Sequence, residues 1–197
     1  MAFEVLLALA GFSLVSSITP GPNNLMLLAS GVNYGFWRSL PHMVGISGGF
    51  CFLLLCTGFG LGQLLETAPM LYTILKFAGA SYLVFLAWKI ANSGPLGKSD
   101  GSGKPFSFLE AAAFQWVNPK AWVMAVTSMT VYTNTANHTA TVLMVAGIFT
   151  IINLPSIALW CGMGQGLRQF LADPARLKIF NVTMALLLIA SLWPMLR

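Results

Sequence analysis

Residues Ile18 to Leu25 read ITPGPNNL and interrupt an apolar run that begins near Val5. Each of the two prolines removes a backbone donor and clashes with the preceding turn, and the glycine between them adds backbone freedom. A helix through this stretch is therefore expected to break. If the run lies in lipid, polar side chains must satisfy the freed backbone groups or hold a polar substrate. The candidate substrate-binding residues here are Thr19, Pro20, Gly21, Pro22, Asn23 and Asn24, and a purely structural kink is the alternative.

A second break with the same ingredients lies in FQWVNPKAW at Phe114 to Trp122. A lysine at the centre of a bilayer costs roughly 2.5 to 3.5 kcal/mol on insertion scales, and such residues usually face a partner or an aqueous cavity. No acidic residue lies at matching depth, so a substrate carboxylate or the carbonyl ends of a broken helix are the expected partners. The alternative is a lysine that snorkels to the interface. The candidates at this break are Gln115, Asn118, Pro119 and Lys120.

The composition predicts a membrane protein. Of 197 residues, 57% are apolar and 8% are charged, against roughly 25% charged in a soluble domain. Ten Lys and Arg with five Asp and Glu are too few to keep the chain dispersed in water, so lipid is the expected solvent. The net charge of +5 does not indicate a nucleic-acid partner, because the basic residues are scattered singly along the chain.

Windows of about 20 residues with few charges predict six transmembrane helices, of which the first and fourth are broken. The fold class expected is thus an all-α, multi-pass membrane protein. The connections are short except for residues 92–107, whose sequence NSGPLGKSDGSGKPFS predicts a polar loop. The windows run approximately over Val5–Ser30, Leu40–Leu61, Met70–Ile90, Phe108–Tyr132, Thr139–Cys161 and Ile179–Leu196.

Weak similarities between the two halves predict an internal repeat. Asn23 corresponds to Asn118, GFGLG at 58–62 to GMGQG at 162–166, and KFAGASYLVFLA at 76–87 to IFNVTMALLLIA at 179–190. Three spans per half is an odd number, so the copies must enter the membrane in opposite senses. We expect one domain, 1–197, with inverted three-helix repeats of about 1–92 and 105–197 and a substrate site at the interrupted helices. Chance similarity among 19 glycines is the alternative.

Lys and Arg near the span ends predict the orientation. All but three of the ten basic residues lie at one side, which is therefore expected to be cytoplasmic, together with the loop 92–107. The N- and C-termini are then expected in the periplasm. The residues that set this orientation are Arg38, Lys89, Lys98, Lys104, Arg168, Arg176 and Lys178.

Other chemistries find little support. Clustered metal ligands, paired carboxylates, a nucleophile with its base and a phosphate-binding loop are all missing from the sequence, so we expect neither an enzyme nor a metal or other cofactor. Gly45 and Gly49 form a GxxxG pattern in the second predicted span. Such small faces allow close helix approach, either inside the bundle or in a homodimer.

The sequence resembles the LysE/RhtB family of amino-acid exporters at ITPGPNNL (18–25), FQWVNPKAW (114–122), GASYLVFLAWKI (79–90) and the glycine-rich VGISGGF of the second span. The resemblance covers nearly the whole chain and implies secondary export of amino acids or close derivatives across the bacterial inner membrane. Many family members carry an aspartate where this chain has Phe50. Without that acid a cationic substrate has no obvious counter-charge. A small neutral amino acid or derivative is therefore expected, and the pattern is similar to the family's cysteine and O-acetylserine exporters.

The predicted function is alternating-access export, with the two breaks facing each other. Asn23 and Asn118 are expected to hold the polar groups of the amino acid, and Lys120 its carboxylate. The proton gradient or the membrane potential would supply the energy, although no central carboxylate or histidine is visible as a coupling group. A passive amino-acid channel or a non-transporting membrane subunit is the alternative.

Overall fold

The computed structural model describes residues 2–61, 69–93 and 104–193, and every regular element in these ranges is a helix. The predicted all-α class is confirmed. The long helices are α1 (Phe3–Ile18), α2 (Pro22–Tyr34), α3 (Leu40–Cys56), α5 (Pro69–Ala91), α6 (Phe108–Gln115), α7 (Pro119–Tyr132), α8 (His138–Leu167) and α9 (Pro174–Ala190). Short helical turns η1 (Trp37–Ser39), η2 (Thr57–Leu61) and η3 (Phe170–Ala172) flank them.

Both predicted helix breaks are present. α1 ends at Ile18 and α2 begins at Pro22, with a bend of 55° between them. α6 ends at Gln115 and α7 begins at Pro119. Each following helix has its proline in the first turn, where a missing backbone donor costs nothing and the fixed φ angle suits a helix. At each break, proline is therefore incompatible with a continuous helix and favourable at the start of the next one.

Length and composition identify membrane-crossing helices among the described residues. Trp37–Leu61 and His138–Leu167 are each long and apolar enough to cross a membrane, and the bent pair α1 and α2 makes a third candidate. Phe77–Ala91 within α5 is a shorter apolar helix. Each of the six predicted windows overlaps a helix or a broken pair, and residues 194–196 of the sixth lie outside the described residues. Six spans in a membrane stay a prediction.

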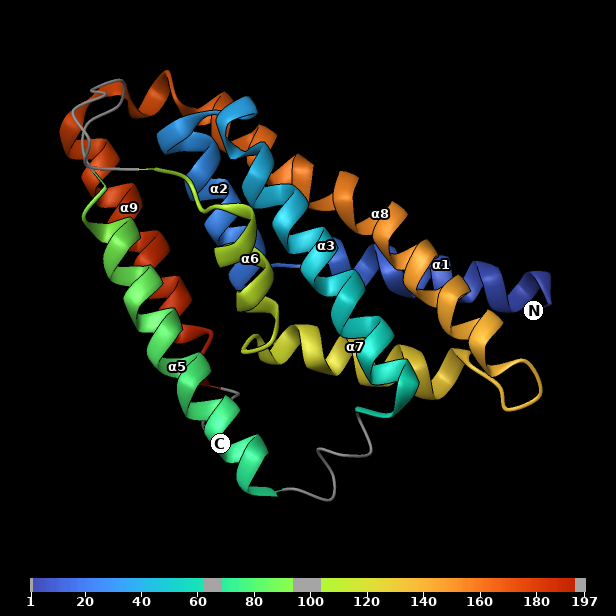
Figure 1. Cartoon of the computed structure of the whole chain (residues 1–197). Coiled ribbons are helices and arrows are strands. Elements are labelled where there is room, and N and C mark those ends of the chain that lie inside the picture. Colours follow the sequence, from blue (N-terminus) through green and yellow to red (C-terminus); the bar gives the residue numbers. More distant parts are fainter. Residues whose placement is uncertain (1, 62–68, 94–103, 194–197) are drawn as a thin grey trace.

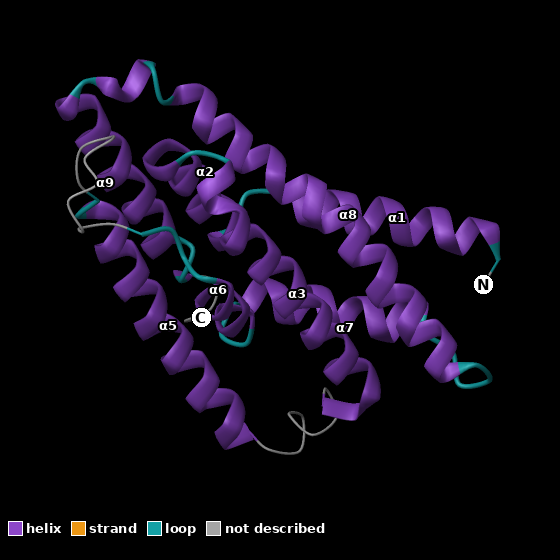
Figure 2. Cartoon of the chain, turned by 45° about the horizontal axis from the view of Figure 1, so that its top comes forward, coloured by secondary structure: helices purple, strands orange, loops and turns teal. Residues whose placement is uncertain are grey.

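Two apolar clusters lie on either side of the breaks. In the first, which we call the α2–α6 cluster, buried residues of those helices pack with α5, α9 and parts of α3 and α8. The second, the α1–α7 cluster, joins those helices to the remaining halves of α3 and α8. Figures 1 and 2 show α3 and α8 running side by side along the molecule, and α5 beside α9 at one flank. The breaks therefore lie between two separately packed regions.

Glycines allow the closest helix contacts. A Cβ on Gly45 or Gly49 of α3 would collide with the backbone of α6, and one on Gly31 of α2 with the Cys161 carbonyl of α8. The internal packing expected for the GxxxG pair is thus present. A homodimer through Gly45 and Gly49 stays an untested alternative, but it would have to displace α6.

The sixth predicted window begins too late. α9 begins at Pro174, five residues before the predicted start at Ile179, because Asp173 accepts hydrogen bonds from the backbone of Ala175 and Arg176 (3.0 Å each) and caps the helix. Charged residues lie at this end of the helix, so a prediction from apolar windows places the helix start too late.

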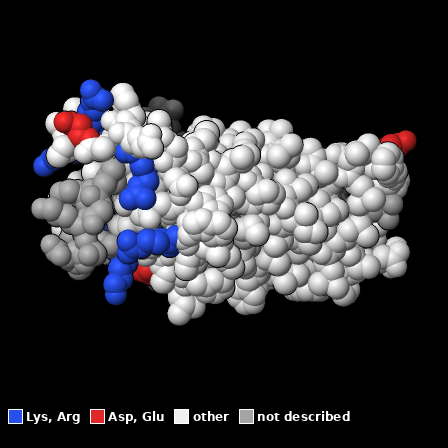
Figure 3. All heavy atoms as spheres, turned by 90° about the horizontal axis from the view of Figure 1, so that it is seen from above, with Lys and Arg blue, Asp and Glu red and all other residues white. Residues whose placement is uncertain are grey.

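Charge is unevenly distributed over the surface. Figure 3 shows Lys and Arg gathered at one end of the molecule, while the rest of that face is almost free of charge. At this end Figure 1 shows the α2–α3 and α8–α9 connections close together, and the N-terminus and the α7–α8 turn lie at the other. Of the predicted loop 92–107, residues 94–103 with Lys98 lie outside the described residues.

Candidate functional site

The two helix breaks face each other and are joined by an amide pair. Asn23 Nδ2 donates to Gln115 Oε1 at 2.8 Å, and Gln115 Nε2 donates back to Asn23 Oδ1 at 3.1 Å. Gln115 also donates to the Ala111 carbonyl one turn earlier, at 2.9 Å, which holds its side chain in place. Residues 92 positions apart in the sequence thus bridge the first turn of α2 and the last turn of α6.

Lys120 reaches across to the other break. Its Nζ donates to the Thr19 carbonyl at 2.7 Å, to Thr19 Oγ1 at 2.8 Å and to the Pro20 carbonyl at 3.4 Å. These oxygens follow the C-terminal end of α1, where the helix dipole favours a cation. Of the two kinds of partner expected for this lysine, the carbonyl end of a broken helix is the one found. Gly21 makes room, because a Cβ there would stand 2.9 Å from Lys120 Cδ.

The other freed carbonyls of α1 are also satisfied by side chains. Asn24 Nδ2 donates to the carbonyls of Ser17 and Thr19, at 2.8 Å each. Trp160 of α8 donates from Nε1 to the Ile18 carbonyl at 3.0 Å. Asn24 therefore serves the backbone, as the structural-kink alternative requires. The sequence predicts Trp160 only as an interfacial residue near a span end, and its contact with the break was missed.

The second break is stabilised locally. Asn118 caps α7 by accepting from the Lys120 backbone N–H at 3.1 Å, and Trp122 Nε1 donates to the Trp116 carbonyl at 2.8 Å. Both α2 and α7 begin at this place, so their N-terminal ends, with partial positive charge, meet there. An anionic group between the breaks would be stabilised by both.

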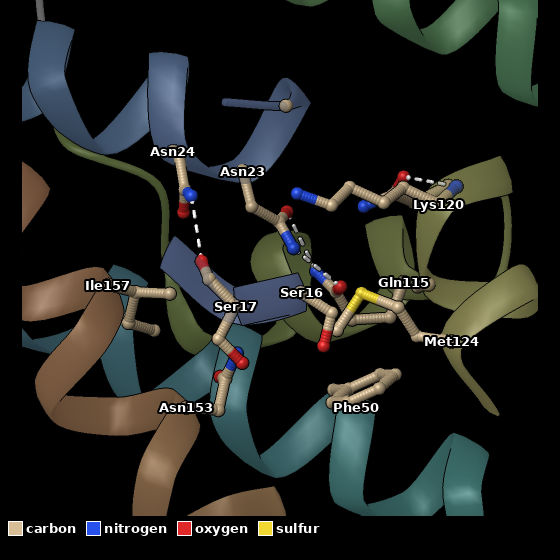
Figure 4. A pocket seen from close by; sticks show the side chains of 13 residues that line it. Ser16, Ser17, Asn23, Asn24, Phe50, Gln115, Lys120, Met124, Asn153 and Ile157 are labelled. Carbon is tan, nitrogen blue, oxygen red and sulfur yellow. Dashed lines mark hydrogen bonds between the residues drawn. The ribbon is translucent and has the colours of Figure 1, made fainter. Parts of the chain in front are cut away.

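A pocket lies between the breaks (Figure 4). Among the described residues that line the pocket, Lys120 is the one charged residue. The carboxylates of the described residues lie outside the pocket lining. The complete lining is Ser16, Ser17, Gly21, Asn23, Asn24, Phe50, Gln115, Asn118, Lys120, Ala121, Met124, Asn153 and Ile157.

Six of the ten predicted site residues line this pocket: Gly21, Asn23, Asn24, Gln115, Asn118 and Lys120. The other four, Thr19, Pro20, Pro22 and Pro119, shape the breaks without lining it. The other lining residues were missed as site residues: Ser16, Ser17, Phe50, Ala121, Met124, Asn153 and Ile157. An asparagine in the middle of an apolar helix, in INLPS at 152–156, was the one signal in the sequence that could have found Asn153.

Phe50 occupies the pocket wall at the position singled out in the sequence for lacking an acid. It is buried, and its ring packs edge-on against Phe149 of α8 with centroids 5.4 Å apart. Together with Met124 and Ile157 it makes part of the pocket apolar. The pocket therefore combines a cation, several amides and a small apolar surface.

Comparison with known proteins identifies relatives along nearly the whole chain. The model of the LysE type translocator family matches residues 14–191. A cysteine/O-acetylserine efflux protein of Escherichia coli is 34% identical over 181 residues, which cover 90% of each chain. One of the same description from Shigella flexneri is 40% identical over 123 residues, or 61% of this chain and 62% of the relative. No solved structure matches the chain significantly.

Proposed function

This chain belongs to the LysE type translocator family, and from that premise we propose that it is a secondary active exporter of a small neutral amino acid or derivative. The observation that carries the proposal is the polar pocket between two facing helix breaks, with Lys120 as its charged residue. Broken helices of corresponding position are where such transporters bind substrate.

The chemistry of the pocket suits a zwitterion. Lys120 and the N-terminal ends of α2 and α7 together favour a carboxylate. Asn23, Asn118 and Gln115 offer neutral amides to the other polar groups of the substrate, and the apolar part of the wall suits a short side chain. The relatives are named for cysteine and O-acetylserine, both small and neutral overall. These two compounds are the first candidate substrates.

The packing supports an inverted repeat of about 1–92 and 105–197 within one domain. In the proposed repeat α1 corresponds to α6, α2 to α7 and α3 to α8. Replacing these helices of the α2–α6 cluster by their counterparts, with α5 and α9 left aside, gives the helices of the α1–α7 cluster. In both halves the broken helix also packs on the second helix of the other half, α2 on α8 and α6 on α3, and glycines make both contacts close.

Alternating access is supported by a departure from this symmetry. Buried residues of α5 and α9 pack into the α2–α6 cluster, whereas in the described residues they contribute none to the α1–α7 cluster. In an inverted repeat the opposite arrangement is an equivalent state of similar energy. We propose that exchange between the two arrangements opens the pocket to either side in turn.

The chain is a membrane protein, and we propose the bacterial inner membrane with the charged end of Figure 3 in the cytoplasm. The gathering of basic residues at that end supports this orientation. Both termini then face the periplasm. The proton gradient or the membrane potential would supply the energy for export.

The test is export from whole cells. The protein is overproduced in bacteria loaded with L-cysteine or O-acetyl-L-serine, and the extracellular amino acids are measured over time. We expect faster export of a small neutral amino acid, continuing against its own concentration gradient and stopping when an ionophore dissipates the membrane potential and the proton gradient. Export that stops at equal concentrations would indicate a passive channel. Amounts equal to those of empty-vector cells for all amino acids would contradict the exporter.

A further inference from the structure

Asn153 of α8 carries a buried acceptor that is not hydrogen-bonded by any of the described residues. The residue is 5% exposed, and its Nδ2 donates to Ser17 Oγ of α1 at 3.2 Å. Within the described part of the chain its Oδ1 has no hydrogen-bond partner. A buried polar atom left unpaired is destabilising, so such atoms in native proteins call for an explanation.

The position of Asn153 supplies one, because the residue lines the pocket between the breaks. Figure 4 shows Asn153 and Lys120 on opposite sides of the pocket, with the Asn23 and Gln115 side chains between them. Asn23 and Gln115 hydrogen-bond to each other, and Asn24 Nδ2 donates to the α1 carbonyls. Among the described residues that line the pocket, the Asn153 amide oxygen is the buried side-chain atom left without a hydrogen-bond partner.

Resting on the proposed exporter function, we propose that Asn153 determines specificity by accepting a hydrogen bond from the ammonium group of the substrate while Lys120 holds the carboxylate. An amino acid carries its cation and its anion on the same carbon, and the ammonium group is a strong donor that must find an acceptor when it leaves water. The pocket then binds the substrate by both charged groups. A ligand that lacks the ammonium group leaves the Asn153 oxygen unpaired.

The neutrality of this acceptor matters as well. An amide oxygen accepts from an ammonium group without adding a charge, so an amine that brings no carboxylate meets Lys120 with no compensating anion. An acidic residue at the same place would attract such amines. Asn153 thus selects for zwitterions, whereas a role limited to tying α8 to Ser17 of α1 would leave ligand preference untouched.

The first experiment uses the wild-type protein in proteoliposomes. Uptake of labelled L-cysteine is measured against two competitors, 3-mercaptopropionate, which is cysteine without its ammonium group, and cysteamine, which is cysteine without its carboxylate. We expect 3-mercaptopropionate to compete about tenfold more weakly than L-cysteine or worse, the size of effect that a lost hydrogen bond to a charged group produces. If 3-mercaptopropionate competes as strongly as unlabelled L-cysteine, the proposal is overturned, whatever the variants do.

The second experiment changes the acceptor. Asn153→Asp is expected to make cysteamine about tenfold more effective as a competitor, because a carboxylate adds the attraction of an opposite charge to the hydrogen bond with the ammonium group. Asn153→Leu is expected to abolish L-cysteine uptake. The matched control is Asn181→Asp, since Asn181 is as buried but pairs with Asn33 (2.9 and 3.2 Å) outside this pocket. That control should leave the cysteamine competition as in the wild type.

The outcomes separate the two proposals. An Asn153→Asp protein that transports L-cysteine with unchanged competition by cysteamine overturns the role of Asn153 and leaves the exporter intact. A wild-type protein that transports no small neutral amino acid or derivative overturns the proposed function itself. If the Asn153→Asp protein does not insert, the comparison of 3-mercaptopropionate with L-cysteine on the wild type still decides.

Discussion

At the scale of single residues, Lys120 has two tasks. Its ammonium group hydrogen-bonds to the Thr19 and Pro20 oxygens beyond α1, which offsets part of the cost of a cation at this depth. The same group is the charged member of the pocket lining. A substrate carboxylate that reaches Lys120 would therefore couple substrate binding to the end of α1.

We expect Lys120→Met to lower export at least about tenfold while the protein still inserts, because methionine keeps much of the side-chain volume and removes the charge. The initial rate of export and the amount of protein in the membrane fraction are both measured. Lys178→Met is the control, since Lys178 is exposed at the charged end. Wild-type export by the Lys120 variant would remove this residue from the site.

At the scale of elements, the contact between α2 and α8 depends on two glycines. A Cβ on Gly31 would meet the Cys161 carbonyl, and a Cβ on Gly164 would meet the Leu28 carbonyl. In lipid, helices gain little from the hydrophobic effect on association, so close backbone packing of this kind carries much of the stability. α2 also carries Asn23, so the contact keeps one wall of the pocket in place.

We expect Gly164→Ala to lower the free energy of unfolding by about 1 to 3 kcal/mol, the usual cost of forcing a methyl group into a packed contact. Gly162→Ala is the matched control on the same helix, because a Cβ there meets none of the described residues within 4 Å. Its effect should be neutral or stabilising by up to about 1 kcal/mol through helix propensity. Thermal unfolding of both variants in detergent measures the difference, and equal melting temperatures would contradict the packing described here.

At the scale of the whole molecule, the basic residues and the more extensive helix packing lie at the same end. The end with the basic residues is also the end where α5 and α9 join the α2–α6 cluster. If this end is cytoplasmic, the arrangement described here is packed more extensively on the cytoplasmic side of the breaks than on the periplasmic side. The breaks then lie where the two regions can move relative to each other.

Single cysteines test this orientation. Asn92→Cys lies at the charged end and Asn137→Cys at the opposite end, and both positions are exposed. We expect a membrane-impermeant maleimide to label Asn137→Cys on intact cells, and Asn92→Cys only after permeabilisation. The unmodified protein gives the background from Cys51, Cys56 and Cys161. The reverse pattern would place the charged end in the periplasm.

The sequence by itself determined the solvent, the helical class and both breaks, because these depend on local properties. Scarce charge selects lipid, and the prolines of TPGPN and NPK remove the backbone donors that a continuous helix would need there. Only the tertiary structure decided which polar groups meet. Lys120 binds Thr19 and Gln115 pairs with Asn23 from far along the chain, and Asn153 reaches the pocket because α8 packs on α1. Such pairings follow from how whole helices cross, and no property of the residues themselves encodes their partners.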